Sequence, residues 1–136
     1  MKWKMINTKF DIDLSYGVQM EKNLKEFFEG KKIEVKTERG RCSNKGSWIY
    51  TGNHAVEFRY NGNPSGIAVT EAEYWAIVLA EEEEMLQIHI IPTEKLKEIT
   101  RKHYKNGRVV KGGDDNLSDL VLVPIKEIAL ACLNRL

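Results

Sequence analysis

In the stretch Ile33-Glu34-Val35-Lys36-Thr37-Glu38-Arg39, residues 33–38 alternate between uncharged and charged side chains. Successive side chains of an extended chain point to opposite faces, so this pattern predicts a short strand over residues 31–39. The acid, base and acid at Glu34, Lys36 and Glu38 then share one face of that strand. Lysine and glutamate are weak strand formers, so a charged row of this kind indicates a purpose beyond strand propensity. The plain alternative is the solvated face of an edge strand.

The composition around this stretch is that of an ordinary globular protein. With 136 residues the chain is long enough for a single domain, 1–136, that buries a sizeable core. Its net charge is only +1, so any affinity for nucleic acid has to come from a local basic patch. Two cysteines without metal-ligand spacing favour a reducing compartment, and no apolar run is long enough to cross a membrane. We therefore expect a cytoplasmic protein without membrane contact.

Hydrophobic periodicity along the chain predicts a mixed arrangement of helices and strands. Helices are expected at about 18–29, 71–82, 94–104 and 126–134, and strands at 31–39, 54–60, 86–91 and 120–123. The second of these helices follows Thr70, which forms a capping-box pattern with Glu73. Residues 10–14 suit a short strand or an extended lead-in, and residues 67–69 a short buried strand. The fold class predicted is α/β, with a central mixed β-sheet flanked by helices.

Four glutamates can converge in this arrangement. Glu34, Glu38 and Glu57 share a sheet face if the strands 31–39 and 54–60 pair as an antiparallel hairpin. Glu21 lies on the inward stripe of the first helix and reaches that face if the helix packs on it. Magnesium prefers such oxygen ligands and can polarise a phosphodiester or generate hydroxide. Lys36 would orient or deprotonate the attacking water, or neutralise charge on the phosphate.

The longer context resembles the PD-(D/E)xK nuclease superfamily, which includes restriction enzymes and archaeal and phage Holliday-junction resolvases. The resemblance covers roughly residues 10–80, with a looser match at Gly112-Gly113-Asp114. The chain is similar above all to phage-encoded endonucleases of that superfamily. The segments that carry it are Asp13-Leu14-Ser15-Tyr16-Gly17 with Glu21, Ile33 to Arg39, Thr51-Gly52-Asn53 with Glu57, Pro64-Ser65-Gly66-Ile67, and Thr70 with Trp75.

The resemblance implies a restriction-endonuclease-like fold, Mg²⁺ or Mn²⁺ as cofactor, and hydrolysis of DNA phosphodiesters. It also implies preference for branched DNA, a homodimer, and the host cytoplasm if the protein is phage-encoded. Carried over by position, Glu21 matches the helix acid, while Glu34 and Lys36 match the acid and lysine of the E-x-K pair. We therefore expect Glu34 and Lys36 to be catalytic.

The sequence departs from the superfamily pattern at its first aspartate, because no aspartate lies between Glu21 and Glu34. Glu57, Glu38 or Asp13 is left to supply the missing ligand. The expected metal ligands are Glu21, Glu34, Glu57 and Glu38, whereas Asp13 is expected to shape the lead-in to the first helix.

Basic side chains gather in two places, near the charged strand and in the segment 101–111. Such residues suit contacts to the DNA backbone, which are salt-sensitive and carry no sequence information. His54 is a weaker candidate for a phosphate contact. The expected nucleic-acid contacts are Arg39, Arg41, Lys45, Asn53, Arg101, Lys102, Lys105 and Arg108.

Three functions remain open at this point. The first is a metal-dependent DNA endonuclease, which needs the acids and the basic patch. The second is a non-catalytic nucleic-acid-binding domain that keeps the nuclease fold. The third is a small α/β interaction protein whose acids are simply solvated.

Overall fold

The computed structural model describes residues 8–42, 48–49, 51–81 and 84–132. The chain divides into two compact units, unit 1 at Met1–Lys31 and unit 2 at Lys32–Leu136. Among the described helices, none is both long enough and apolar enough to cross a membrane.

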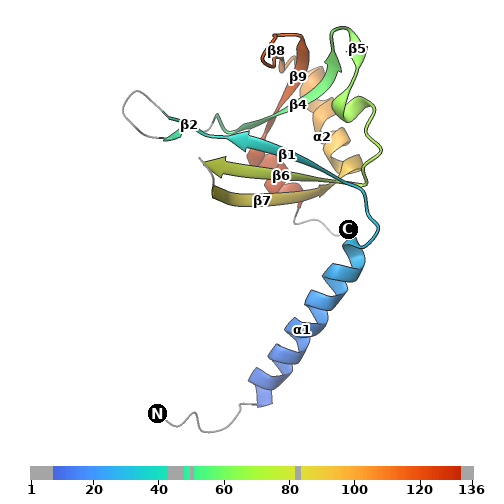
Figure 1. The fold of residues 1–136 in the computed structure, drawn as a ribbon, viewed down its shortest axis with the longest axis vertical. Coiled ribbons are helices and arrows are strands. Elements are labelled where there is room, and N and C mark those ends of the chain that lie inside the picture. Colours follow the sequence, from blue (N-terminus) through green and yellow to red (C-terminus); the bar gives the residue numbers. More distant parts are fainter. Residues whose placement is uncertain (1–7, 43–47, 50, 82–83, 133–136) are drawn as a thin grey trace. The chain divides into compact units, whose positions relative to one another are not determined.

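Unit 1 contains the helix α1, which spans Thr8–Phe28 (Figure 1). The helix expected at 18–29 is confirmed, but the strand or extended lead-in expected at 10–14 is wrong because this segment is helical as well. A five-residue alternation is too short to distinguish the period of a strand from that of a helix. Gly17 does not interrupt the helix, since an interior glycine costs only about 1 kcal/mol relative to alanine.

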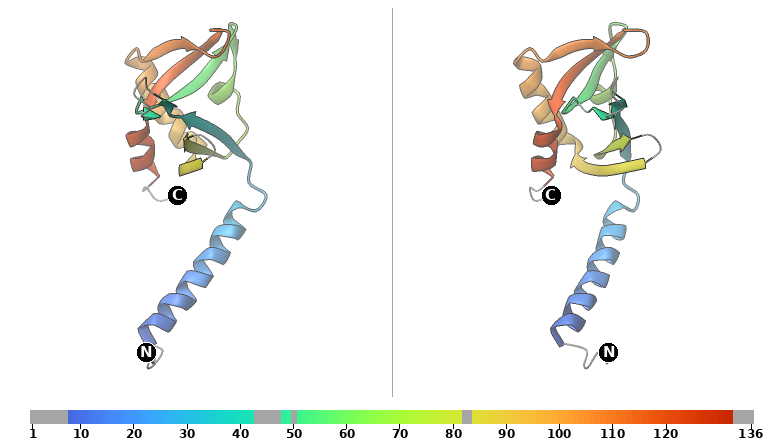
Figure 2. Two further views of the ribbon diagram at one scale, coloured as in Figure 1. Left: turned by 60° about the vertical axis from the view of Figure 1, so that its left-hand side comes forward. Right: turned by 90° about the vertical axis from the view of Figure 1, so that its left-hand side faces the viewer.

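The described residues of unit 2 form strands, two α-helices and a short 3₁₀ helix (Figures 1 and 2). In chain order they are β1 (Ile33–Arg39), β2 (Arg41–Cys42), β3 (Trp48–Ile49), β4 (Asn53–Tyr60), β5 (Asn63–Pro64), η1 (Gly66–Ala68), β6 (Tyr74–Glu81), β7 (Glu84–Pro92), α2 (Thr93–Lys105), β8 (Val109–Gly112), β9 (Ser118–Pro124) and α3 (Ile125–Ala131). The described strands form a three-stranded sheet β1-β6-β7, a four-stranded sheet β5-β4-β9-β8 and the pair β2-β3.

The sheet β1-β6-β7 is mixed, because β1 runs parallel to β6 and β7 runs antiparallel to it. The predicted α/β class with a mixed sheet is confirmed. The helix expected at 71–82 is wrong, since this segment is the central strand β6. A strand buried on both faces reads as a continuous apolar run, which cannot be told from a buried helix by periodicity. The Thr70 hydroxyl accepts a hydrogen bond from the Ala72 amide at 3.2 Å and closes a turn instead of starting a helix.

The hairpin expected between 31–39 and 54–60 is also wrong. Strand β1 pairs with β6, whereas β4 pairs antiparallel with β9 and with the short β5. A turn follows Tyr60: Asn61 and Gly62 both have positive φ, 47° and 82°, as a two-residue type I′ hairpin turn requires. This turn pairs β4 with β5. The other neighbour of β4 is β9, which no short loop connects to it, so tertiary packing determines that pairing.

Helix α2 packs against β9, β7 and β6, and α3 packs against β7 and β9. The strands expected at 86–91 and 120–123 and the helix at 94–104 are confirmed as β7, β9 and α2. The closing helix is confirmed as α3 up to Ala131, and residues 133–136 lie outside the described residues. The segment expected as a strand at 67–69 lies in η1 instead. The largest fully buried side chains are Trp75, Ile77, Ile91, Leu96, Ile128, Val56, Val121 and Val123.

The strand assignment of β6 predicts a large difference between two isoleucines. Ile77 is 1% exposed in the core, whereas Ile88 on the neighbouring strand is 53% exposed on the outer face. Ile77→Ala should lower the free energy of unfolding by about 2–5 kcal/mol, because it leaves a cavity. Ile88→Ala should change it by no more than about 0.5 kcal/mol. Urea denaturation followed by circular dichroism measures both; similar losses would contradict the described faces of the sheet.

Candidate nucleic-acid interface

The charged row of β1 lies on the inner face of its sheet. In the parallel register Glu34 is opposite Trp75 and Lys36 is opposite Ile77, and paired residues share a face. The three charged side chains are half-buried, whereas the alternate residues such as Val35 are exposed. The predicted alternation is confirmed, and the charged face is the one turned toward the core.

The structure brings the two expected catalytic residues together. The Lys36 Nζ lies 2.8 Å from the Glu34 Oε1, and it also lies over the Trp75 ring at 5.8 Å from the centroid. The Lys36 and Glu34 side chains remain 43% and 40% exposed. Solvent and a solvated ligand can therefore reach this ion pair.

Glu38 joins β1 to β4. Its Oε1 accepts a hydrogen bond from the Ala55 amide at 3.0 Å and lies 2.5 Å from the Nδ1 of His54. The His54 imidazole is buried, and within the described residues its Nε2 has no hydrogen-bond partner. His54 was a candidate for a phosphate contact, but its described partner is the Glu38 carboxylate.

Glu57 lies away from this row. It stands three residues after His54 on β4, so its side chain points to the opposite face of that strand. There its Oε1 accepts a hydrogen bond from the Ser118 Oγ at 2.6 Å. Glu21 lies on α1 in unit 1, and the backbone of Asp13 belongs to the same helix.

Within unit 2, Glu57 is not brought together with Glu34 and Glu38 as the sequence suggested. Among the described residues there is no group of three or more His, Cys, Asp or Glu side chains that could hold a metal ion. Convergence of Glu57 with Glu34 and Glu38 depended on a hairpin that does not form, because β4 pairs with β9 and β5. Glu34 and Glu38 therefore remain as the two expected ligands that share one strand face.

Several expected DNA contacts are used within the protein. Lys102 and the neighbouring His103 both bind the Glu127 carboxylate on α3, and these contacts hold the pKa of Glu127 below its ordinary value. Arg108 donates from Nη2 to the Asn53 Oδ1 at 2.7 Å and from Nε to the Leu122 carbonyl at 3.0 Å. These bonds stabilise the packing of α2 against α3 and join the residue before β8 to strands β9 and β4.

Other expected contacts face solvent. Arg39, Arg101 and Lys105 are exposed, and the described residues provide none of them with an ion-pair partner. Arg41 belongs to β2, but its side chain lies outside the described part, as does the whole of Lys45.

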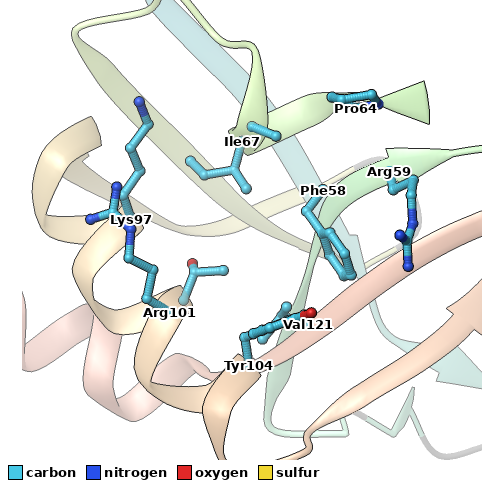
Figure 3. Close-up of a pocket in the computed structure, with 10 residues that line it drawn as sticks. Phe58, Arg59, Pro64, Ile67, Lys97, Arg101, Tyr104 and Val121 are labelled. Carbon is cyan, nitrogen blue, oxygen red and sulfur yellow. The ribbon is translucent and has the colours of Figure 1, made fainter. Parts of the chain in front are cut away.

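A pocket of about 490 Å³ opens between α2, β4, η1 and β9 (Figure 3). Phe58, Ile67 and Val121 supply apolar lining, and the Phe58 ring packs edge-on against Tyr104 at 5.4 Å between centroids. Basic side chains reach the pocket from two sides, Arg59 from β4 and Lys97 and Arg101 from α2. Of these three cations, only Arg101 was expected from the sequence as a nucleic-acid contact. The sequence signal that could have indicated the pocket is the spacing of Lys97, Arg101 and Tyr104 at i, i+4 and i+7, which places them on one helix face.

The pocket holds its shape partly through Gly66 at the start of η1. Gly66 has a φ of +52°, and a Cβ at this position would lie 2.2 Å from the Glu57 carbonyl oxygen. Glycine is required for both reasons. This close approach places η1 directly on β4, next to Phe58.

At the β4 side of the pocket, Arg59 shares the carboxylate of Asp119 with Lys111. The Arg59 Nε lies 2.5 Å from one oxygen of Asp119 and the Lys111 Nζ 2.6 Å from the other. Hydrogen bonds from the two cations hold the pKa of Asp119 below its ordinary value of 3.8. Two cations and one carboxylate leave this cluster with a net positive charge.

Comparison of the chain with known protein families, curated proteins and solved structures gives no match.

The Asp119 cluster predicts a pH-dependent contribution to stability. A carboxylate whose folded-state pKa is lowered stabilises the protein above its unfolded-state pKa, and this contribution is lost as the pH falls through the folded-state pKa. Asp119→Asn should therefore lower the urea midpoint at pH 7, and its difference from wild type should shrink below pH 3.8. Asp114→Asn, at an exposed aspartate, is the matched control and should leave the midpoint unchanged. A difference independent of pH would contradict the electrostatic origin.

The Glu38 contact predicts a second stability effect. Glu38→Ala leaves the Ala55 amide and the buried His54 Nδ1 without their acceptor, which should cost about 1–3 kcal/mol of unfolding free energy. Glu71→Ala is the control because the Lys32–Glu71 pair is exposed and such pairs contribute about 0–1 kcal/mol. Denaturant unfolding of the two variants compares them directly. Equal small losses would show that Glu38 does not join the sheets.

Proposed function

We propose that the protein binds DNA through the exposed face of α2 and the adjoining pocket. One observation carries this proposal: Lys97, Arg101 and Lys105 follow one another at intervals of four residues along α2. Residues four apart lie on the same helix face, so the three cations form a row. In a protein whose net charge is only +1, such a local row is the feature that a phosphate backbone would recognise.

The charges of this row are available for phosphate. Among the described residues, Lys97 has one long ion-pair contact, with Glu94 at 3.6 Å, and Glu94 is itself exposed. Pairs of this kind are weak and readily exchanged for another anion. Arg101 and Lys105 have no carboxylate partner within the described residues, in contrast to Lys102 on the side of α2 that faces Glu127.

The DNA-binding proposal predicts a salt-dependent loss of affinity. The double variant Arg101→Gln/Lys105→Gln should weaken binding about tenfold or more, and it should reduce the slope of log affinity against log salt by about 2, one for each phosphate contact. Lys102→Gln is the matched control on the same helix and should leave the slope unchanged. Fluorescence anisotropy of labelled DNA over a salt series measures both quantities. Equal effects of the control and the double variant would refute the proposed face.

A second candidate function is the endonuclease activity that the resemblance implies. Its support is the contact of Glu34 with Lys36 on a solvent-accessible strand face, with Glu38 two residues on. In this role the Lys36 ammonium would neutralise charge on a bound phosphate. Glu34 would hold the ammonium in position. Mg²⁺ or Mn²⁺, branched DNA as substrate, a homodimer and a cytoplasmic location belong to this proposal.

The endonuclease proposal predicts cleavage that depends on the Glu34–Lys36 pair. Plasmid, linear and four-way-junction DNA are incubated with Mg²⁺, with Mn²⁺ or with a chelator, using wild type, Glu34→Ala and Lys36→Ala. Wild type should cut with metal only, and each variant should lose most of the activity. Glu71→Ala is the control for a surface carboxylate. If wild type binds DNA but cuts none of these substrates, the endonuclease proposal is refuted and the DNA-binding proposal stands. Equal cutting by all variants would indicate a contaminating nuclease.

A further inference from the structure

The pocket beside α2 is larger than contacts to a phosphate backbone require. Its volume of about 490 Å³ lies within the range of about 300–1,000 Å³ that is usual for small-ligand sites. Ile67 and Val121 in its lining are buried core residues, so the apolar floor is part of the folded scaffold. A lone phosphate would leave this floor unused.

The lining combines aromatic surface with positive charge. Phe58 and Tyr104 meet edge to face, and the Arg59 guanidinium lies over the Phe58 ring, 5.4 Å from its centroid. Lys97 and Arg101 bring ammonium and guanidinium groups from the opposite side (Figure 3). Among the described residues that line the pocket none is acidic. The site therefore favours a ligand with a flat apolar part and an anionic part.

We propose that this pocket binds an unpaired nucleotide, with the base against Phe58 and Tyr104 and its phosphate on Lys97 and Arg101. The proposal rests on the proposed DNA binding and names the part of the substrate that α2 recognises. Nucleobases stack on aromatic rings and on guanidinium planes in single-strand binding sites. The edges of a base also need polar partners. Thr100 offers one, because its hydroxyl donates to the Leu96 carbonyl at 2.7 Å and keeps lone pairs for a base N–H.

Two sources can provide this chemistry, a free mononucleotide or an unpaired nucleotide in a DNA strand, as at an overhang or a branch. Extruding a base from a duplex costs unpairing and unstacking energy, so an already unpaired base is favoured. A branched or ended DNA would present such a base next to phosphates that the row on α2 contacts. The second source is therefore expected to bind more tightly than the first.

The test uses the intact protein and three probes: dAMP, a duplex with a single-stranded overhang carrying 2-aminopurine, and a blunt duplex of the same length. Tyr104 is 53% exposed, so Tyr104→Ala should fold normally. This variant should weaken binding of dAMP and of the overhang about tenfold, since a stacking partner is lost. Its binding of the blunt duplex should be unchanged, and Tyr104→Phe should restore the wild-type affinities. Tyr16→Ala, at an exposed tyrosine in unit 1, is the matched control.

The outcomes separate this inference from the function on which it rests. A tyrosine-dependent preference for the overhang, with quenched 2-aminopurine fluorescence, supports the nucleotide site. Equal loss on all three probes, or no loss on any, overturns it while leaving the salt-dependent DNA binding intact. Tyrosine-dependent binding of dAMP without binding of either DNA supports the pocket as a mononucleotide site and refutes the DNA-binding proposal.

Discussion

Strand β6 is the constraint on which the arrangement of unit 2 depends. It is hydrogen-bonded to β1 on one side and to β7 on the other, and it supplies Trp75 and Ile77 to the core. The parallel register with β1 places Glu34 beside Trp75 and so turns the charged row inward. Without β6 as the central strand, β1 would have no sheet, and its charged residues would have no face to share with the core.

A charged row on the inner face of a sheet destabilises the fold unless its charges have partners, because ionised groups lose solvation when they are buried. Each charged side chain of this row has a partner. Glu34 and Lys36 pair with each other, and Glu38 accepts from the first residues of β4. The same side chains that indicated a metal site thus serve as electrostatic links, and the half-buried Glu34–Lys36 pair keeps more access to solvent than Glu38 does.

Helix α2 divides its residues between two tasks. Leu96, Thr100 and His103 are buried against the sheets and α3, whereas Arg101 and Lys105 face solvent. Because a helix repeats every 3.6 residues, packing of one face fixes the direction of the other. The core contacts of α2 therefore direct Lys97, Arg101 and Tyr104 toward the pocket beside β4. The proposed nucleotide site is a consequence of how the core is packed.

The sequence by itself determined the elements whose signals are local. Alternation gave β1 with its two faces, the Asn61-Gly62 pair gave the turn after β4, and amphipathic periodicity gave α2. The contact of Glu34 with Lys36 followed as well, since residues two apart on a strand point the same way.

Only the tertiary structure decided the state of residues 74–81, the partners of β1 and β4, and therefore which acids meet. A continuous apolar run is compatible with a buried helix and with a central strand, so its tertiary contacts determine which of the two forms. Glu57 was misplaced for the same reason, because β4 joins β9, distant in sequence, and not β1. Local patterns specify which faces need burial, and long-range pairing specifies what buries them.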